Sequence, residues 1–266
     1  MKKKKHLQGL NVVFIGAGNV AEHLSALFAE AGATIVQTVR KSKSGAGKKF
    51  AKSYITDIKK LKRDADLYVI AVPDDAIAGV AKSMPALKGT VVHTSGSVPM
   101  ATLKKFTSHG VFWPLQSFSQ ARPVTITAFP ICLEGSSQEV VEALMECAGG
   151  INKNAYVLSS AQREIVHLAA VFANNFSNHM FTVADDLLKK NKLPFDLVRP
   201  VILETAFKAM DMSPAEAQTG PAIRGDKKTI AHHEKMLKGN PSLEKMYKRL
   251  TKSISKKLPD AKLTKK

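Results

Sequence analysis

The sequence predicts an α/β domain built on a parallel sheet, followed by an all-helical C-terminal domain. From residue 10 to about residue 159, short apolar runs with β-forming residues alternate with amphipathic stretches, which is typical of parallel βαβ units. After residue 160 no strand pattern recurs, and helical periods separated by proline and glycine take over. We therefore expect two domains, at residues 1–159 and 160–266.

The individual elements follow from the same patterns. The expected strands are residues 11–15, 34–39, 67–72, 90–94, 111–113, 125–133 and 155–158. The expected helices of the first domain are residues 19–31, 44–53, 76–83 and 138–147. The expected helices of the second domain are residues 161–190, 196–210, 227–238 and 242–257.

Size and composition favour a cytoplasmic globular protein. The chain has 266 residues, of which 44% are hydrophobic, enough to bury a sizeable core. The lysines at positions 2–5 precede a short strand pattern rather than the apolar segment of a secretion signal, and no apolar run approaches the length of a membrane span. Cys132 and Cys147 lack the density of a disulfide scaffold and the spacing of a zinc site, so we expect no metal.

The formal net charge of +18 raises the question of a nucleic-acid partner, because lysine and arginine neutralise phosphates. The lysines are spread along the whole chain, however, and few aromatic residues lie among them to stack on bases. This distribution favours a charged, well-solvated surface without nucleic-acid binding. Its positive field would also attract anionic cofactors and substrates.

A glycine-rich element follows the first expected strand and opens the first expected helix. It has the pattern G-x-G-x-x-A and consists of Gly16, Ala17, Gly18, Asn19, Val20 and Ala21. In a Rossmann-type dinucleotide site the first glycine permits a tight turn, the second lets the backbone approach a pyrophosphate, and the small third residue brings the helix close to the sheet. A glycine turn without a ligand is the alternative. The strand–turn–helix context favours the dinucleotide site.

The end of the second expected strand indicates which dinucleotide is bound. Sites for NAD usually place an acidic residue about 20 residues after the glycines, to accept hydrogen bonds from the ribose. Here Arg40, Lys41 and Ser42 stand in that region, and they can donate charge-assisted hydrogen bonds to a ribose phosphate. We therefore expect NADP as the cofactor. A solvated loop in a lysine-rich protein is the alternative.

Other candidates follow from the rule that ligands bind beyond the carboxyl ends of parallel strands. Val72 and Pro73 end one expected strand, His93 and Ser95 lie at the end of the next, and residues 113–118 follow a third. We expect Val72, Pro73, His93 and Ser95 to line the nicotinamide half of the cofactor. Local turns, with Asp74 capping a helix, would explain the same residues.

The long helix expected at residues 161–190 has two different faces. One face is an ordinary core stripe that contains Ala169, Phe172, Ala173, Phe176 and Met180. The opposite face carries His167, Asn174 and Asn178, which project in nearly the same direction.

We interpret this polar face as the lining of a cleft. His167 is the candidate general acid, because imidazole titrates near neutral pH, and Asn174 would orient the substrate. A structural histidine and a polar or oligomer-facing surface are the alternatives.

A second polar cluster lies at residues 219–226, just before the helix expected at 227–238. Its glycines and proline predict an unusual turn, and Asp226 can cap the helix. Arg224 could hold a carboxylate or phosphate through two parallel hydrogen bonds. A pairing of Arg224 with Asp226 that only stiffens the turn is the alternative.

With these motifs, the chain resembles a family of bacterial Rossmann-like proteins described as NADP oxidoreductases, which carry a C-terminal domain of unknown function. The resemblance covers nearly the whole chain and rests on residues 16–21, 71–74, 93–97, 114–118, 167–175 and 219–226. The N-terminal half also looks like deazaflavin-dependent NADP oxidoreductases and pyrroline-carboxylate reductases. This likeness implies a helical domain that often dimerises, so we expect a homodimer.

One feature departs from the related hydroxyacid dehydrogenases. Those enzymes carry a catalytic lysine on the first long helix after the Rossmann domain, whereas this helix has no lysine before Lys189. Their mechanism is therefore not transferred to this chain.

The sequence thus favours an NADP(H)-dependent oxidoreductase. It would transfer a hydride to or from a small, anionic carbonyl or imine substrate in the cleft between the domains, with His167 exchanging the proton and Arg224 holding the acidic group. The alternative is a non-catalytic NADP-binding sensor or interaction protein, which needs the glycine element but no aligned proton donor.

Overall fold

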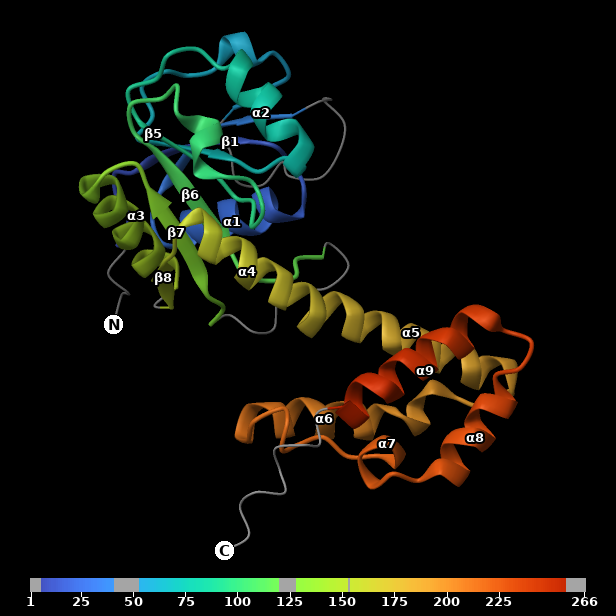
Figure 1. The fold of residues 1–266 in the computed structure, drawn as a ribbon. Coiled ribbons are helices and arrows are strands. Elements are labelled where there is room, and N and C mark those ends of the chain that lie inside the picture. Colours follow the sequence, from blue (N-terminus) through green and yellow to red (C-terminus); the bar gives the residue numbers. More distant parts are fainter. Residues whose placement is uncertain (1–5, 41–52, 120–127, 153, 257–266) are drawn as a thin grey trace, which may run out of the picture. The chain divides into compact units, whose positions relative to one another are not determined.

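The computed structural model describes residues 6–40, 53–119, 128–152 and 154–256 (Figure 1). The chain divides into two compact units, Met1–Ser177 and Asn178–Lys266, which we call the sheet unit and the helical unit. The division falls later than the expected boundary at residue 159. The start of the first long helix belongs with the sheet because a buried arginine on it is tied to a strand, as described below.

The sheet has the topology of a Rossmann fold. Its strands are β1 (Asn11–Ile15), β2 (Thr34–Val39), β3 (Tyr54–Ile55), β4 (Leu67–Ile70), β5 (Thr90–His93), β6 (His109–Pro114), β7 (Ile131–Gly135) and β8 (Ala155–Val157). The spatial order is β3-β2-β1-β4-β5-β6-β7-β8, and the strands from β1 to β6 are parallel. Their carboxyl ends therefore lie at one edge of the sheet, where ligands of this fold bind. The predicted α/β class is confirmed.

The far end of the sheet differs from the wholly parallel expectation. β7 runs antiparallel to β6, and β8 is parallel to β7. A parallel neighbour requires a crossover connection, usually a helix, and the sequence predicts no helix between these two strands. Because the sequence predicts no crossover helix between β6 and β7, an antiparallel pairing of these strands is the one that their connection permits.

Helices cover both faces of the sheet (Figure 1). α1 (Asn19–Glu30) and α3 (Gln138–Ile151) pack over one face in a single apolar cluster that includes Phe14, Phe28 and Phe112. α2 (Asp74–Ser83) and the short helix η2 (Met100–Leu103) pack over the other face. A further short helix, η1, spans Ile58–Lys60. All but the last residue of the helix expected at 44–53 lie outside the described residues.

Three consecutive segments occupy the expected long helix. α4 (Ser160–Ala170) is followed by the π-helical segment η3 (Val171–Phe176) and by α5 (Ser177–Lys190). The Ser159 side chain accepts a hydrogen bond from the Gln162 backbone N–H, and the Gln162 side chain accepts one from the Ser159 N–H, a capping box that fixes the start of α4. Segments of π-helix are rare and frequently occur at functional sites. The wider π turn also alters the direction in which residues beyond it project.

The expected core stripe of this helix is wrong for the single chain. Phe172 is 61% exposed and Phe176 is 50% exposed, although their rings pack edge to face against each other. The stripe was predicted to belong to the core, but no described element of the chain buries it.

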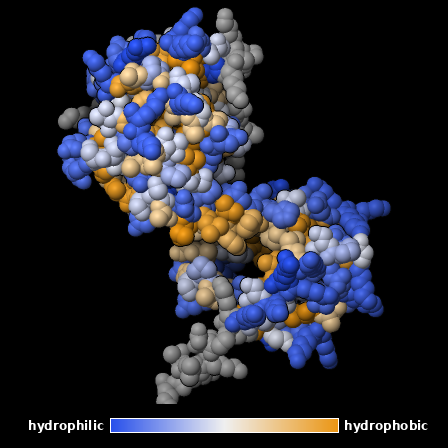
Figure 2. Space-filling model, turned by 45° about the horizontal axis from the view of Figure 1, so that its top comes forward, coloured by the Kyte–Doolittle hydropathy of each residue, from blue (hydrophilic) through white to orange (hydrophobic). Residues whose placement is uncertain are grey.

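The helical unit contains η4 (Phe195–Leu197), α6 (Arg199–Asp211), α7 (Pro221–Arg224), α8 (Lys227–Met236) and α9 (Pro241–Lys256) in addition to α5. The Ser255 hydroxyl donates to the Ala222 carbonyl, and Tyr247 contacts His233 at 3.0 Å, so α7, α8 and α9 pack together. Among the described residues of this unit Ala222 alone is buried. Apolar side chains reach its surface between hydrophilic ones (Figure 2). Within the described part of the chain, no helix combines the length and apolar character needed to cross a membrane.

Candidate functional site

The glycine-rich turn lies between β1 and α1, as the sequence predicts, and Gly16 is its most constrained residue. Gly16 has φ of 120°, and its N–H donates to the Val39 carbonyl at 2.9 Å. A Cβ atom at this position would lie 2.0 Å from the Ala71 carbonyl oxygen. Only glycine meets both conditions. The turn is thereby held against the ends of β2 and β4.

The second glycine has space around it. Gly18 is the N-cap residue of α1, is exposed, and a Cβ atom there would meet no atom within 4 Å. The N-terminus of α1 therefore presents its unpaired N–H groups beside an open position, which suits a pyrophosphate. Ala21 is buried where the helix meets the sheet, and the Asn19 side-chain amide donates to the Phe118 carbonyl at 3.1 Å. Ala17 and Val20 are half-buried.

Arg40 stands at the carboxyl end of β2, beside the glycine turn. Its backbone N–H donates to the Ile55 carbonyl at 3.0 Å, and its guanidinium carbon lies 4.5 Å from the centre of the Tyr54 ring. Arg40 thus follows Val39, the residue whose carbonyl accepts the Gly16 N–H. Lys41 and Ser42, which were expected to share its role, lie outside the described residues.

The ends of β4 and β5 are joined by polar contacts. Pro73 is the N-cap residue of α2, and Val72 lies next to Gly16. The Ser97 hydroxyl donates to Asp74 at 2.6 Å. The Ser95 hydroxyl accepts hydrogen bonds from the backbone N–H groups of Ser97 and Val98. Residues 95–98 therefore form a hydrogen-bonded loop at the carboxyl edge of the sheet.

His93 lies inside the domain rather than on its surface. Its side chain is fully buried, and its Nδ1 accepts a hydrogen bond from the Ser95 N–H at 3.2 Å. Burial, followed by the positive charge of Arg163, lowers the pKa of His93 to about 4. The imidazole is therefore neutral near pH 7. This burial argues against the expectation that His93 lines the cofactor.

This buried histidine predicts a pH dependence of stability. Below the ordinary pKa of 6.5 the unfolded chain binds a proton on His93, whereas the folded protein does so only below its pKa of about 4. The free energy of unfolding should therefore fall as the pH falls through this window, by about 2 kcal/mol between about pH 8 and about pH 5. Urea denaturation of the wild type and of His93→Asn measures it, and the variant should lack this share of the loss. The matched variant His179→Asn, on an exposed histidine, should keep the wild-type dependence. An equal loss in all three proteins would contradict the assignment.

His167 on α4 packs at the same edge of the sheet. Its ring centre lies 5.8 Å from that of Trp113, near the end of β6. A Cβ atom at Gly96 would lie 2.7 Å from His167 Cδ2 and 2.7 Å from Trp113 Cζ2, so the missing side chain of Gly96 allows this approach. His167 is half-buried and thus retains access to solvent. The structure brings it to the carboxyl ends of β5 and β6.

Arg163, which sequence analysis missed, anchors His167. It is 1% exposed and lies one helical turn before His167 on α4. Its guanidinium forms an ion pair with Glu134 of β7 and donates to the Val98 carbonyl of the loop after β5. The Ser160 hydroxyl also donates to Glu134 at 2.8 Å. The Arg163 Nη atoms tie this buried charge to a strand and a loop, while its buried Nε has no hydrogen-bond partner among the described residues, and these contacts fix the position of α4 on the sheet.

The remaining predicted residues are exposed. Asn174 lies on the π segment of the sheet unit, whereas Arg224 ends α7 in the helical unit. The prediction that Asp226 caps the next helix is confirmed, because its carboxylate accepts hydrogen bonds from the Thr229 N–H and hydroxyl. These bonds, followed by smaller contributions that include the charge of Arg224, lower the pKa of Asp226.

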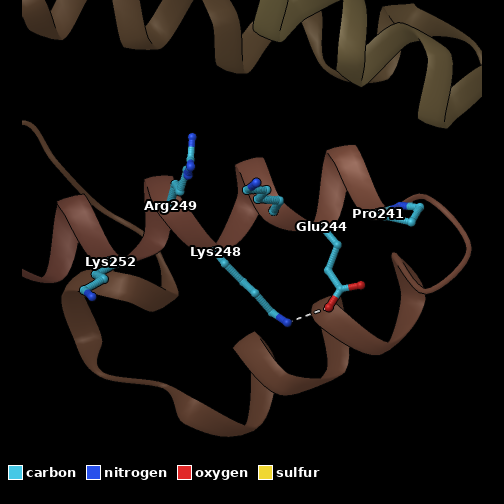
Figure 3. Close-up of a pocket in the computed structure, with 6 residues that line it drawn as sticks. Pro241, Glu244, Lys248, Arg249 and Lys252 are labelled. Atoms are coloured by element: carbon cyan, nitrogen blue, oxygen red, sulfur yellow. Dashed lines mark hydrogen bonds and ion pairs between the residues drawn. The ribbon is translucent and has the colours of Figure 1, made fainter.

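A hollow of about 420 Å³ lies along α9 of the helical unit (Figure 3). Its lining residues all belong to α9 and are Pro241, Glu244, Lys245, Lys248, Arg249 and Lys252. Lys248 forms an ion pair with Glu244, and the lining is otherwise strongly basic. This hollow has no glycine turn and no strand end, and it is not the dinucleotide site.

Comparison with known proteins decides the family. Two family models match consecutive parts of the chain: a Rossmann-like domain at residues 3–117 and the domain of unknown function DUF2520 at residues 129–254. The crystal structure of the "putative NADP oxidoreductase BF3122" from Bacteroides fragilis is 36% identical, with a TM-score of 0.85 over 95% of this chain and 99% of that one. This chain belongs to the family of Rossmann-like DUF2520 proteins. The comparison with curated proteins gives no match.

More distant structures share the fold of this DUF2520 protein. The 1-pyrroline-5-carboxylate reductase of Streptococcus pyogenes is 12% identical, with a TM-score of 0.60 over 93% of this chain and 98% of that one. The imine reductase of Myxococcus stipitatus, solved with NADP+, is 12% identical, with a TM-score of 0.59 over 92% of each chain. At this identity the likeness shows the fold alone.

Proposed function

We propose that this DUF2520 protein is an NADP(H)-dependent oxidoreductase that acts on a small, anionic carbonyl or imine substrate. The observation that carries the proposal is the place of His167, which lies beside Gly96 and Trp113 at the edge of the sheet that also holds the glycine turn. A nucleotide turn and a histidine able to exchange protons thus share one edge of one domain. The names of the similar proteins, which include NADP oxidoreductases and reductases of imines, agree with this reaction class.

The residues present fit a dinucleotide phosphate. The open position at Gly18 and the N-terminus of α1 would hold the pyrophosphate, and Arg40 at the end of β2 would hold the ribose phosphate. Val72 and Pro73 follow β4 at the edge where the nicotinamide end of a dinucleotide lies in this fold, whereas Ser95 is only 4% exposed and its hydroxyl is bound within the loop after β5, so we no longer propose it as a lining residue. NADPH, when bound, supplies the hydride.

The protein must then supply the proton. Reduction of a carbonyl or imine places negative charge on oxygen or leaves nitrogen to be protonated, and a positioned acid lowers the barrier. His93 is neutral and enclosed, so it cannot exchange this proton with solvent near pH 7. His167 is half-buried, and Arg163 holds its helix in place. We therefore propose that His167 donates the proton to the reduced substrate.

Two further residues complete the proposal. Asn174 would orient the substrate, because its amide can donate and accept hydrogen bonds. Arg224 would hold the acidic group of the substrate, since a guanidinium matches a carboxylate in a bidentate manner. Both side chains are exposed and thus accessible to a ligand.

The first experiment is a fluorescence titration with NADPH and, in parallel, NADH. We expect tighter binding of NADPH, and Arg40→Ala should weaken NADPH binding by about tenfold or more while NADH binding changes little. Arg63→Ala, on an exposed arginine of the same unit, is the matched control and should bind both nucleotides like the wild type. If the wild type binds neither nucleotide, the proposed function is wrong.

We also propose that the protein assembles as a homodimer through its helical unit. Ala222 alone is buried among the described residues of the helical unit, so large apolar side chains are left in water, including Phe207 at 61% exposure and Met210 at 84%. A second copy would cover such a surface by a symmetric contact. Sedimentation at micromolar concentration should show a dimer, which Phe207→Glu should shift toward monomer and Lys235→Glu should not. A monomeric wild type would contradict this proposal.

A further inference from the structure

The contact between Arg40 and Tyr54 joins the end of β2 to the edge strand of the sheet. Tyr54 begins β3 and is paired with Thr38 of β2, two residues before Arg40. The guanidinium carbon of Arg40 lies 4.5 Å from the centre of the Tyr54 ring, well within the range of a cation–π contact. Both side chains are half-buried. The Tyr54 ring therefore contacts Arg40, the residue that we propose binds the ribose phosphate.

Backbone hydrogen bonds fix the position of the chain at Arg40 and at its neighbour Val39. The Arg40 N–H donates to the Ile55 carbonyl, and the preceding residue, Val39, accepts the hydrogen bond of the Gly16 N–H. Arg40 is thus tied to β3 on one side and adjoins the glycine turn on the other. With the backbone held in this way, the contact with the ring restricts the direction of the Arg40 side chain.

Contact with a ring face also restricts the orientation of the guanidinium. The N–H donors of arginine lie in the guanidinium plane and form a rigid fork that matches two oxygens of a phosphate. A flexible arginine loses conformational entropy when it binds, whereas one already held by a ring loses less. The aromatic face, rather than the phenolic hydroxyl, supplies this contact, so phenylalanine should preserve it.

We propose that Tyr54 is a positioning residue that determines nucleotide specificity: its ring holds the Arg40 guanidinium ready for the ribose phosphate that distinguishes NADP from NAD. This proposal rests on the proposed function, because it concerns the same nucleotide site. It adds a residue that contacts the arginine rather than the cofactor. Loss of the ring should weaken binding only of ligands that carry the additional phosphate.

The test is a set of binding titrations with four probes: NADPH, NADH, adenosine 2′,5′-bisphosphate and AMP. In Tyr54→Leu, which keeps apolar bulk without a π face, the affinity for NADPH and for the bisphosphate should fall by about 3- to 30-fold. The affinity for NADH and AMP should stay within about twofold. Tyr54→Phe should bind all four probes like the wild type. Tyr156→Leu, on an exposed tyrosine of the opposite edge strand β8, is the matched control and should also bind normally.

A double-mutant cycle separates positioning from a general effect on the fold. In the Arg40→Ala background, Tyr54→Leu should cause no further loss of NADPH affinity, because the group that it positions is absent. Equal weakening of all four probes, an unchanged preference for NADPH in Tyr54→Leu, or a full effect in the Arg40→Ala background would overturn the proposal while the proposed function stands. A wild type that binds neither dinucleotide overturns both.

Discussion

Replacement of His167 by alanine is expected to reduce turnover by about 100- to 10,000-fold while NADPH affinity stays within about twofold of the wild type. The ring of His167 packs against Trp113 and the backbone at Gly96, whereas the glycine turn and Arg40, which we propose to bind the nucleotide, lie elsewhere along the same edge. A proton donor acts in the transition state, so its loss lowers kcat rather than cofactor binding. The measurement is NADPH oxidation with a cyclic imine or a carbonyl acid that the wild type reduces, together with an NADPH titration.

Two comparison variants sharpen this result. His179→Ala removes an exposed histidine of α5 and should leave turnover unchanged. Gly96→Ala keeps the imidazole but introduces a Cβ 2.7 Å from His167 Cδ2, so it should lower turnover by displacing the ring. If His167→Ala retains full activity, another group supplies the proton. If it loses NADPH binding instead, His167 belongs to the nucleotide site.

The geometry of the glycine-rich turn was predictable because its signals are local. Gly16, Gly18 and Ala21 stand within one strand–turn–helix unit, and each has a steric reason that can be stated without the structure. The structure confirms the geometric reasons: a close carbonyl at Gly16, open space at Gly18 and a buried helix contact at Ala21. Periodicity likewise identified β1, α1 and β2, because each is a short and regular pattern.

The anchoring of His167 was not predictable because its partners are distant in sequence. Arg163 meets Glu134 across 29 positions and Val98 across 65. A charged residue on an amphipathic helix is ordinarily exposed, and sequence alone does not show that a strand supplies a carboxylate to bury it. The one signal was its spacing, four residues before the candidate acid on the same face of the helix.

The contact of Tyr54 with Arg40 was missed for a similar reason. The residues just before Tyr54 were expected to form a helix, and a two-residue strand gives almost no periodic signal. Its pairing with β2 depends on the order of strands in the sheet, which the sequence does not contain explicitly. His93 is the opposite case. Its residue type and its place at a strand end suggested that it lines the cofactor, but the fold encloses its side chain.

The two glycines of the glycine-rich turn should differ in how much their replacement by alanine lowers the stability of the protein. Gly16→Ala should destabilise the protein by about 3 kcal/mol, because a Cβ would lie 2.0 Å from the Ala71 oxygen and the φ of 120° is unfavourable for alanine. Gly18→Ala should leave the free energy of unfolding within about 1 kcal/mol, because its φ of −85° suits alanine and its Cβ would meet open space. Urea denaturation measures both.

NADPH affinity, in contrast to stability, should depend on Gly18, because Gly18 lies where the pyrophosphate would approach. In the folded Gly18→Ala variant we expect NADPH affinity to fall by at least about tenfold, because the new methyl group occupies the space next to the N-terminus of α1. Gly79→Ala, on a glycine of α2 whose Cβ would also meet open space, should bind NADPH like the wild type. Normal NADPH binding by Gly18→Ala would mean that the space beside the first helix does not receive the pyrophosphate, and the nucleotide would have to bind at another part of the fold.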